Sequence, residues 1–276
     1  MITFSLPDMV RRAGTRRTST DIRVIEPTKA QVDQLARVYM KVVRAWALIA
    51  KERIMPAYAR SLERRAARDH VAGKMITDDI AEATAALQDA GPELQRLLLT
   101  LTPELRDWFV TYERYHRGKW TANVLSASGI DLALILGPAD AATTLADLLA
   151  WNVSLIADVA AQAQSQIAAA VFSGYQSRQP SREVAKRINE VLQGSKRRAR
   201  FIASDQANKL SSALDQERRR QAGLDWFRWR SSHKRNFRPE HQARDLKEYT
   251  DATAPKDRAG TLPGCGCKEQ AILKLN

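Results

Sequence analysis

The sequence predicts a mainly α protein with a small α+β C-terminal domain, in which long helices are followed by a short β-sheet module. Apolar residues recur every three or four positions over much of residues 32–221, as on one face of a helix. Residues 225–230 then alternate between polar and apolar side chains, and residues 271–275 form another short apolar run, as strands do. With 276 residues, 44% of them hydrophobic, the chain can bury one large or two small cores.

The N-terminal half is expected to contain a basic flexible arm, residues 1–28, and a helical domain, residues 29–129. The arm carries five arginines among Ser, Thr, Gly and Pro, a composition typical of segments that become ordered on a partner. The first long helix of the domain should be kinked or ended by Pro56 and then resume. A short helix from Asp78 should end near Gly91-Pro92, and an aromatic-rich helix should follow, with loops at Gly118 and residues 126–129.

Residues 138–276 are expected to form the C-terminal domain. Its first helix should cover residues 139–173. A helix over residues 181–192 should be closed by Gly194, and a basic helix over residues 196–221 should be capped by Ser195 and stopped by Gly223. The strands over residues 225–230 and 271–275 then imply a small sheet packed on the preceding helices.

Positive charge is concentrated in one part of the chain. The net charge is +13, and residues 178–238 alone hold 17 Lys and Arg against 6 Asp and Glu. A basic patch of this size is typical of contact with nucleic acid phosphates, although an acidic protein partner or a solvated helix face would give the same pattern. The predicted DNA-binding residues are Lys196, Arg197, Arg198, Arg200, Lys209, Arg218, Arg219 and Arg220.

Cysteine use and hydropathy indicate an intracellular protein. The two cysteines, Cys265 and Cys267, are too close to bridge without strain, so both are expected to be reduced. The N-terminus has no apolar run typical of a signal peptide. The most apolar region, residues 130–172, is interrupted by four aspartates, so we expect no membrane span.

The Cys-x-Cys motif has four alternative interpretations. Cys265, Cys267, His241 and His233 could bind zinc, which prefers sulfur and imidazole, although this spacing is atypical of structural zinc sites. Without a metal, His241 and Asp245 would hydrogen-bond locally while the cysteines pack a turn. A catalytic cysteine with His241 and Asp245 is a third interpretation. A metal-dependent nuclease or toxin-type effector using His233, His241 and Asp245 is the fourth.

The same residues also carry a family resemblance. Trp229, the motif Arg238-Pro239-Glu240-His241, Asp245, and the Pro-x-Cys-x-Cys motif ending at Cys267 follow one another in the order of a known signature. The chain therefore resembles the phage Mu F-like head morphogenesis proteins, also called minor head or minor capsid proteins. The resemblance extends upstream over residues 149–223, so residues 138–276 are assigned to a Mu F-like domain. Where the family usually has glycine after the aspartate, this chain has Leu246.

The resemblance implies a non-enzymatic component of the capsid interior that needs no cofactor. Its implied partners are the portal protein, capsid or scaffold proteins and viral double-stranded DNA, with no membrane. It would be made in the host cytoplasm and enter the virion during procapsid assembly. The six signature residues, Trp229, Arg238, His241, Asp245, Cys265 and Cys267, are then expected to be structural.

Overall fold

A computed structural model of the chain describes residues 4–14, 18–72 and 80–275, and these form two compact units. Unit 1 comprises Met1–Leu35, Arg106–Ala150 and Ala203–Asn276. Unit 2 comprises Ala36–Leu105 and Trp151–Ile202. These boundaries differ from the predicted division at residues 129–138, because long helices contribute one half to each unit.

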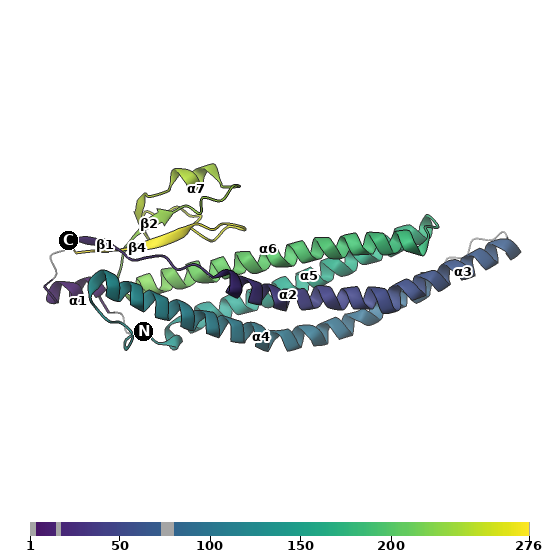
Figure 1. The fold of residues 1–276 in the computed structure, drawn as a ribbon, viewed down its shortest axis with the longest axis horizontal. Helices are drawn as coiled ribbons and strands as arrows, with labels where there is room; N and C mark the ends of the chain where they lie inside the picture. Colours follow the sequence, from purple (N-terminus) through teal and green to yellow (C-terminus); the bar gives the residue numbers. More distant parts are fainter. Residues whose placement is uncertain (1–3, 15–17, 73–79, 276) are drawn as a thin grey trace. The chain divides into compact units, whose positions relative to one another are not determined.

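Helices dominate the described residues, and a small antiparallel sheet lies near the C-terminus (Figure 1). This confirms the predicted fold class. The helical segments are α1 (Leu6–Arg12), α2 (Lys29–Ile49), the π-helical η1 (Ala50–Ile54), α3 (Met55–Ala72), α4 (Ala81–Ser128), the 3-10 helix η3 (Pro138–Ala141), α5 (Ala142–Gln176), α6 (Ser181–Gln221) and α7 (Pro239–Ala243).

The sheet in unit 1 has four strands where the sequence predicted two. Its order is β1-β4-β2-β3, with every neighbouring pair antiparallel; the strands are β1 (Ser19–Asp21), β2 (Trp226–Arg230), β3 (Glu248–Thr250) and β4 (Lys268–Lys274). The two predicted strands correspond to β2 and β4, which pair directly from Trp226↔Ile272 to Arg230↔Lys268. The edge strands β1 and β3 have three residues each, too few to give a clear alternation in the sequence.

The predicted flexible arm, residues 1–28, is corrected by the structure where it is described. Ser5 caps α1 by accepting a hydrogen bond from Asp8 N, and Leu6 N donates to Ala222 O at 2.9 Å. Four apolar side chains of this segment are buried in a core cluster that also holds residues of β4 and the turn after α6: Leu6, Val10, Ile22 and Ile25. Their burial stabilises a segment whose arginines dominate its composition.

Unit 2 contains most of the apolar stripe predicted for the first long helix. Tyr39 and Trp46 of α2 are buried and reach α5, where Tyr39 Oη donates to Asn152 Oδ1 at 2.7 Å and Trp46 Nε1 donates to Ala160 O at 3.0 Å. The π-helical turn η1 precedes Pro56, so the helix changes its hydrogen-bonding pattern where a proline N–H is missing.

Three predicted helix breaks are wrong. α4 continues through Gly91-Pro92 and Gly118, and α6 continues through Gly194. Ser195 does not cap a new helix; its hydroxyl donates to Val191 O within α6. A glycine destabilises a helix by about 1 kcal/mol, and packing of the helical residues before and after it outweighs this penalty. Gly129 and Gly223, in contrast, have φ of +75° and +65° and do end α4 and α6.

Among the described residues, one helical stretch, Ala139–Gln176, is long and apolar enough to cross a membrane. Its most apolar window has a mean hydropathy of 1.3, and 22% of that window is buried. The core helix of a soluble protein meets the same test of length and composition, so the absence of a membrane span stays a prediction.

Candidate functional site

Four of the six signature residues, Trp229, His241, Cys265 and Cys267, meet at a small hydrophobic cluster in unit 1. His241 lies on α7, which begins at Pro239, a residue whose fixed φ favours the first helical position. Cys265 and Cys267 lie in the turn before β4. With Trp229 of β2 and Ala259, the cysteines form a buried cluster, on which Tyr249 and Leu262 pack.

The ring of His241 faces both cysteine sulfurs. His241 Nδ1 lies 3.4 Å from Cys265 Sγ and 3.7 Å from Cys267 Sγ. The three potential ligand atoms all lie within 4.8 Å of one another, and each residue is at most 4% exposed. The structure thus brings together three of the four predicted metal ligands.

The orientation of the imidazole is fixed from its other side. His241 Nε2 lies 3.1 Å from Asp257 Oδ2, and Arg244 Nη1 lies 3.0 Å from Asp257 Oδ1. Hydrogen bonds from Arg244 and then His241 hold the pKa of Asp257 below its ordinary value. A proton on Nε2 therefore has an ionised acceptor, which leaves the Nδ1 lone pair directed at the sulfurs. Trp229 packs edge-on against the imidazole with ring centroids 5.1 Å apart.

The two thiols differ in acidity. The hydrogen bond with Cys267, the backbone N–H groups of Cys267 and Gly260, and the His241 ring lower the pKa of Cys265 to about 5, against the effect of burial. The hydrogen bond to Cys265 and burial raise the pKa of Cys267 above its ordinary value. Because metals bind thiolates, a cation bound to this pair would displace thiol protons.

His233 and Asp245 lie outside this group. His233 is 63% exposed, and its Nε2 lies 3.4 Å from Asp245 Oδ2. Asp245 also accepts a hydrogen bond from Ser231 N at 2.7 Å. The expectations that His233 joins the metal ligands and that His241 bonds Asp245 are both wrong, because His233 is exposed and the carboxylate beside His241 belongs to Asp257.

These hydrogen-bond partners also separate residues that were predicted to act together in the two catalytic interpretations. The nuclease set of His233, His241 and Asp245 is split into a surface pair and the buried group. For a catalytic cysteine, the carboxylate behind His241 is Asp257 in place of Asp245. Sequence reasoning missed Asp257, because no periodic pattern links it to a histidine 16 residues earlier.

The signature position Leu246 shows why glycine suits this place. Leu246 has φ of +63°, the left-handed region in which a side chain costs about 1 kcal/mol or more. Its backbone N–H donates to Trp229 O at 2.9 Å, and Trp229 N donates to Lys247 O at 2.9 Å. This pairing joins the turn before β3 to β2 beside the cluster.

Arg218 and Arg219, both predicted to bind DNA, are buried. Arg218 is 0% exposed and Arg219 is 1% exposed. Arg218 Nη2 donates to Glu113 Oε1 of α4 at 2.6 Å. Arg219 donates to Asp251 Oδ1 at 2.5 Å and to Leu224 O at 2.9 Å. Their placement corrects the prediction, because a side chain without exposed surface cannot reach a phosphate.

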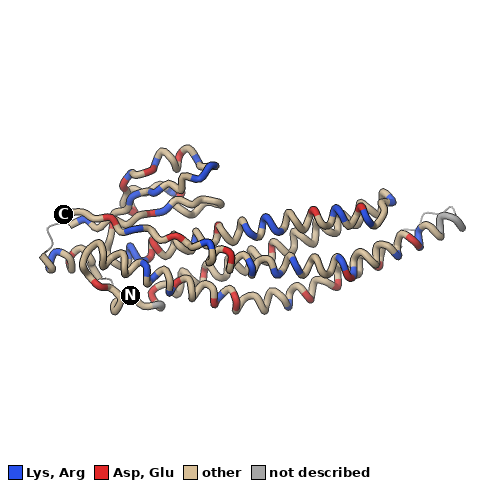
Figure 2. Tube along the Cα trace, in the orientation of Figure 1, with Lys and Arg blue, Asp and Glu red and all other residues tan. Residues whose placement is uncertain are grey.

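The other predicted DNA-binding residues fall into two groups. Lys209 pairs with Asp205 at 2.9 Å, and Arg220 pairs with Glu217. Arg197, Arg198 and Arg200 are exposed and Lys196 is half-buried; none of these four forms an ion pair with a described residue. Figure 2 shows that Lys and Arg also lie along other helices, so exposure and pairing, more than charge alone, distinguish these four.

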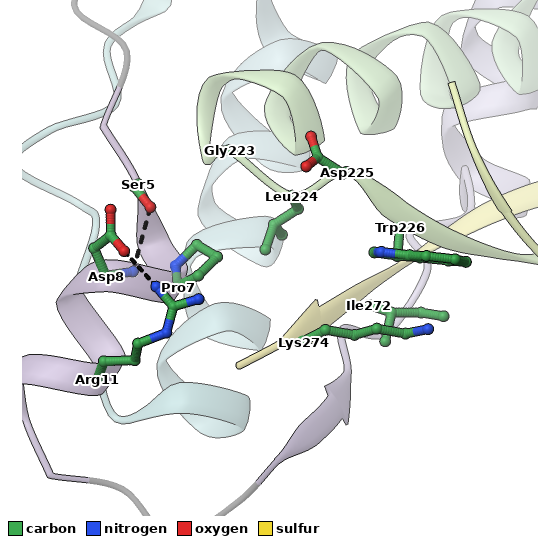
Figure 3. A pocket seen from close by; sticks show the side chains of 10 residues that line it. All are labelled: Ser5, Pro7, Asp8, Arg11, Gly223, Leu224, Asp225, Trp226, Ile272 and Lys274. Carbon is green, nitrogen blue, oxygen red and sulfur yellow. Dashed lines mark hydrogen bonds and ion pairs between the residues drawn. The ribbon is translucent and has the colours of Figure 1, made fainter. Parts of the chain in front are cut away.

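A pocket of about 340 Å³ in unit 1 lies between α1, the turn after α6 and β4, and none of the cluster residues lines it. Figure 3 shows Arg11 beside Asp8 and the Lys274 side chain beneath the Trp226 ring. Lys274 Nζ lies 3.6 Å from the Trp226 ring centroid and 2.8 Å from Glu248 Oε2. The cations of this pocket are therefore already partnered within the chain.

Comparison with known proteins agrees with the signature. Residues 161–270 match the family model described as Phage Mu protein F like protein. This match confirms that residues 161–270 resemble the phage Mu F-like head morphogenesis family. An uncharacterized protein of Haemophilus influenzae strain Rd is 28% identical over 159 residues, covering 56% of this chain and 36% of that relative. The aligned part thus spans about a third of the relative's length. No solved structure matched the chain significantly.

Proposed function

We propose that the chain is a phage minor head protein of the capsid interior, which associates with the portal during procapsid assembly and contacts DNA without reading its sequence. The match of residues 161–270 to the Mu F-like family supports the role in the phage head. A non-enzymatic role accords with the separation of the predicted nuclease residues and the burial of the cysteine cluster.

The proposed DNA contact rests on one face of α6. At 100° per residue, five cations fall within about 100° of arc and extend over roughly 27 Å of helix. We name this set the basic stripe: Arg182, Lys186, Lys196, Arg197 and Arg200. Four of the five are exposed, Lys196 is half-buried, and no described residue forms an ion pair with any of them. This alignment of unpaired cations is the observation that carries the DNA contact.

A row of Lys and Arg on one helix face contacts phosphates and leaves base edges unread, so binding should be salt-dependent and tolerant of sequence. Each phosphate contact contributes about 0.9 to the slope of log affinity against log salt. The double variant Arg197→Ala/Arg200→Ala should therefore bind duplex DNA more weakly and lower that slope by about 1.8.

The matched control is Arg60→Ala/Arg64→Ala, which removes the same charge from α3. Arg60 and Arg64 are both exposed and both paired with Glu82, so their loss should leave the salt slope unchanged. If the two double variants changed DNA affinity and its salt slope equally, or if neither changed them, the proposed DNA contact of the basic stripe would be contradicted. Loss of portal co-purification with unchanged DNA affinity would assign the stripe to a protein partner. Strand cleavage on adding divalent metal would favour the nuclease alternative.

A further inference from the structure

The segment between β2 and β4 has little regular secondary structure and a small hydrophobic cluster. Within residues 231–267, regular structure is limited to α7, with five residues, and β3, with three. Its hydrophobic cluster consists of four buried residues with two partly buried neighbours. Small folds with cores of this size commonly require a disulfide or a metal ion, and both cysteines here are free thiols.

The two separations between His241 Nδ1 and the cysteine sulfurs match the coordination shell of a metal ion. With Zn–S near 2.3 Å and Zn–N near 2.05 Å, a tetrahedral angle separates sulfur and nitrogen by about 3.6 Å. The observed separations from His241 Nδ1 are 3.4 Å and 3.7 Å. Two thiols and an imidazole favour zinc over the hard cations, which prefer oxygen.

The surrounding residues supply the support that metal-binding histidines commonly have. Asp257 faces His241 Nε2, the arrangement in which a carboxylate orients the ring and increases its basicity. The buried Trp229 Nε1 has no hydrogen-bond partner among the described residues, and Trp229 packs in the same hydrophobic cluster as Cys267. An indole N–H directed at a sulfur would stabilise a metal-bound thiolate.

The backbone explains how so short a motif can supply two ligands. Gly264 has φ of +71°, and its N–H donates to the buried Asp205 of α6 at 2.7 Å, which anchors the turn. At Gly266 a Cβ would lie 2.9 Å from Cε of the flexible Lys234 side chain and 3.0 Å from Ser232 Cβ, so a side chain there would require both neighbours to shift. The residue between the cysteines thus permits close approach of residues 232–234.

We propose that His241, Cys265 and Cys267 bind one zinc ion, which fastens the segment between β2 and β4. Three protein ligands leave the fourth tetrahedral position to a non-protein ligand such as water, since no other His, Cys, Asp or Glu of the described residues joins the group. The ion would add to the stability that the four-residue hydrophobic cluster gives this segment.

Full-length protein purified under reducing conditions should contain one zinc per chain. After chelation, cobalt titration should produce the visible absorption of tetrahedral Co²⁺ with thiolate-to-cobalt charge transfer. Cys265→Ser and Cys267→Ser should abolish that absorption, and Asp257→Asn should weaken metal affinity about 10- to 100-fold. His233→Ala is the matched control, because this histidine lies in the same segment outside the ligand group, and it should keep the wild-type spectrum.

The wild type alone also tests the site, in case a cysteine variant fails to fold. The zinc-loaded protein should unfold at a higher temperature than the chelated protein, because metal binding adds to folding stability. Absence of bound zinc or cobalt together with identical unfolding temperatures would overturn the proposal. Loss of the cobalt spectrum in His233→Ala would overturn the choice of ligands.

Discussion

Replacing Arg218 by methionine should destabilise unit 1 without affecting any DNA-binding surface. The guanidinium is 0% exposed, and its Nη2 donates to Glu113 Oε1 at 2.6 Å. Its Nη1 donates to Gln221 Oε1 at 2.9 Å. Methionine preserves the apolar stem but removes both bonds, which leaves Glu113 buried with one cation fewer.

The expected magnitude follows from this geometry. Breaking a buried ion pair by removing one partner costs about 3–5 kcal/mol. Arg117 Nε still donates to Glu113 Oε1 at 3.1 Å, so the carboxylate keeps one partner and we expect the lower end, about 3 kcal/mol. For a unit of about 150 residues, this corresponds to a decrease in unfolding temperature of roughly 6–12 °C.

Thermal unfolding followed by circular dichroism measures this decrease, and DNA affinity is measured well below the transition. Arg197→Met, at an exposed position on α6, should change stability by no more than about 0.5 kcal/mol but weaken DNA binding. Adding Glu113→Leu to Arg218→Met should recover part of the lost stability, because it removes the unpaired charge. An Arg218→Met protein with wild-type unfolding temperature and lost DNA affinity would refute the reasoning.

Two further predictions concern stability. Gly194→Ala, where a Cβ meets nothing within 4 Å, should stabilise by about 0.5–1 kcal/mol, whereas Gly174→Ala, whose Cβ would lie 2.4 Å from Val184 Cγ2, should destabilise by about 1–3 kcal/mol. Denaturant midpoints that shift in the same direction would contradict this contrast. Hydrogen bonds from Lys274 and then from Arg228 lower the pKa of Glu248. The contribution of Glu248 to stability should therefore be fully present above its ordinary pKa of 4.5 and be lost as pH falls through its lower pKa in the folded protein. In unfolding titrations across pH, Glu248→Gln should therefore be less stable than wild type near neutrality and converge with it in acid.

The helices that could be predicted are those with a continuous apolar stripe. In α2, Leu35, Tyr39, Val42 and Trp46 follow one another at the spacing of three or four that predicts one helix face, and all four are buried. Gly194 does not end α6, although glycine carries a free-energy penalty inside a helix. That penalty is about 1 kcal/mol, and the apolar stripe of α6 continues beyond it. Local signals therefore predicted the helices better than their ends.

The contents of the site were predictable in part. The Cys-x-Cys and His241 could be singled out because these residue types are rare in the chain. Their actual partners could not, since Asp257 follows His241 by 16 residues without a pattern that joins them. Burial of Arg218 depends on Glu113, 105 residues earlier, so no local window contains both members of the pair.

The run of positive charge over residues 178–238 therefore contains two physically different groups of cations. The basic stripe is solvated and unpaired, which keeps its charge available to a polyanion. Arg219 is buried and donates to Leu224 O, Asp225 O and Asp251 Oδ1, so it holds the start of β2 and the segment after β3 on the end of α6. The free-energy cost of burying an unpaired guanidinium is very large, and each buried arginine here has several hydrogen-bond acceptors. If every cation of α6 were exposed for DNA binding, none could hold the sheet against this helix. Part of the positive charge that suggests nucleic acid binding is therefore required for the fold.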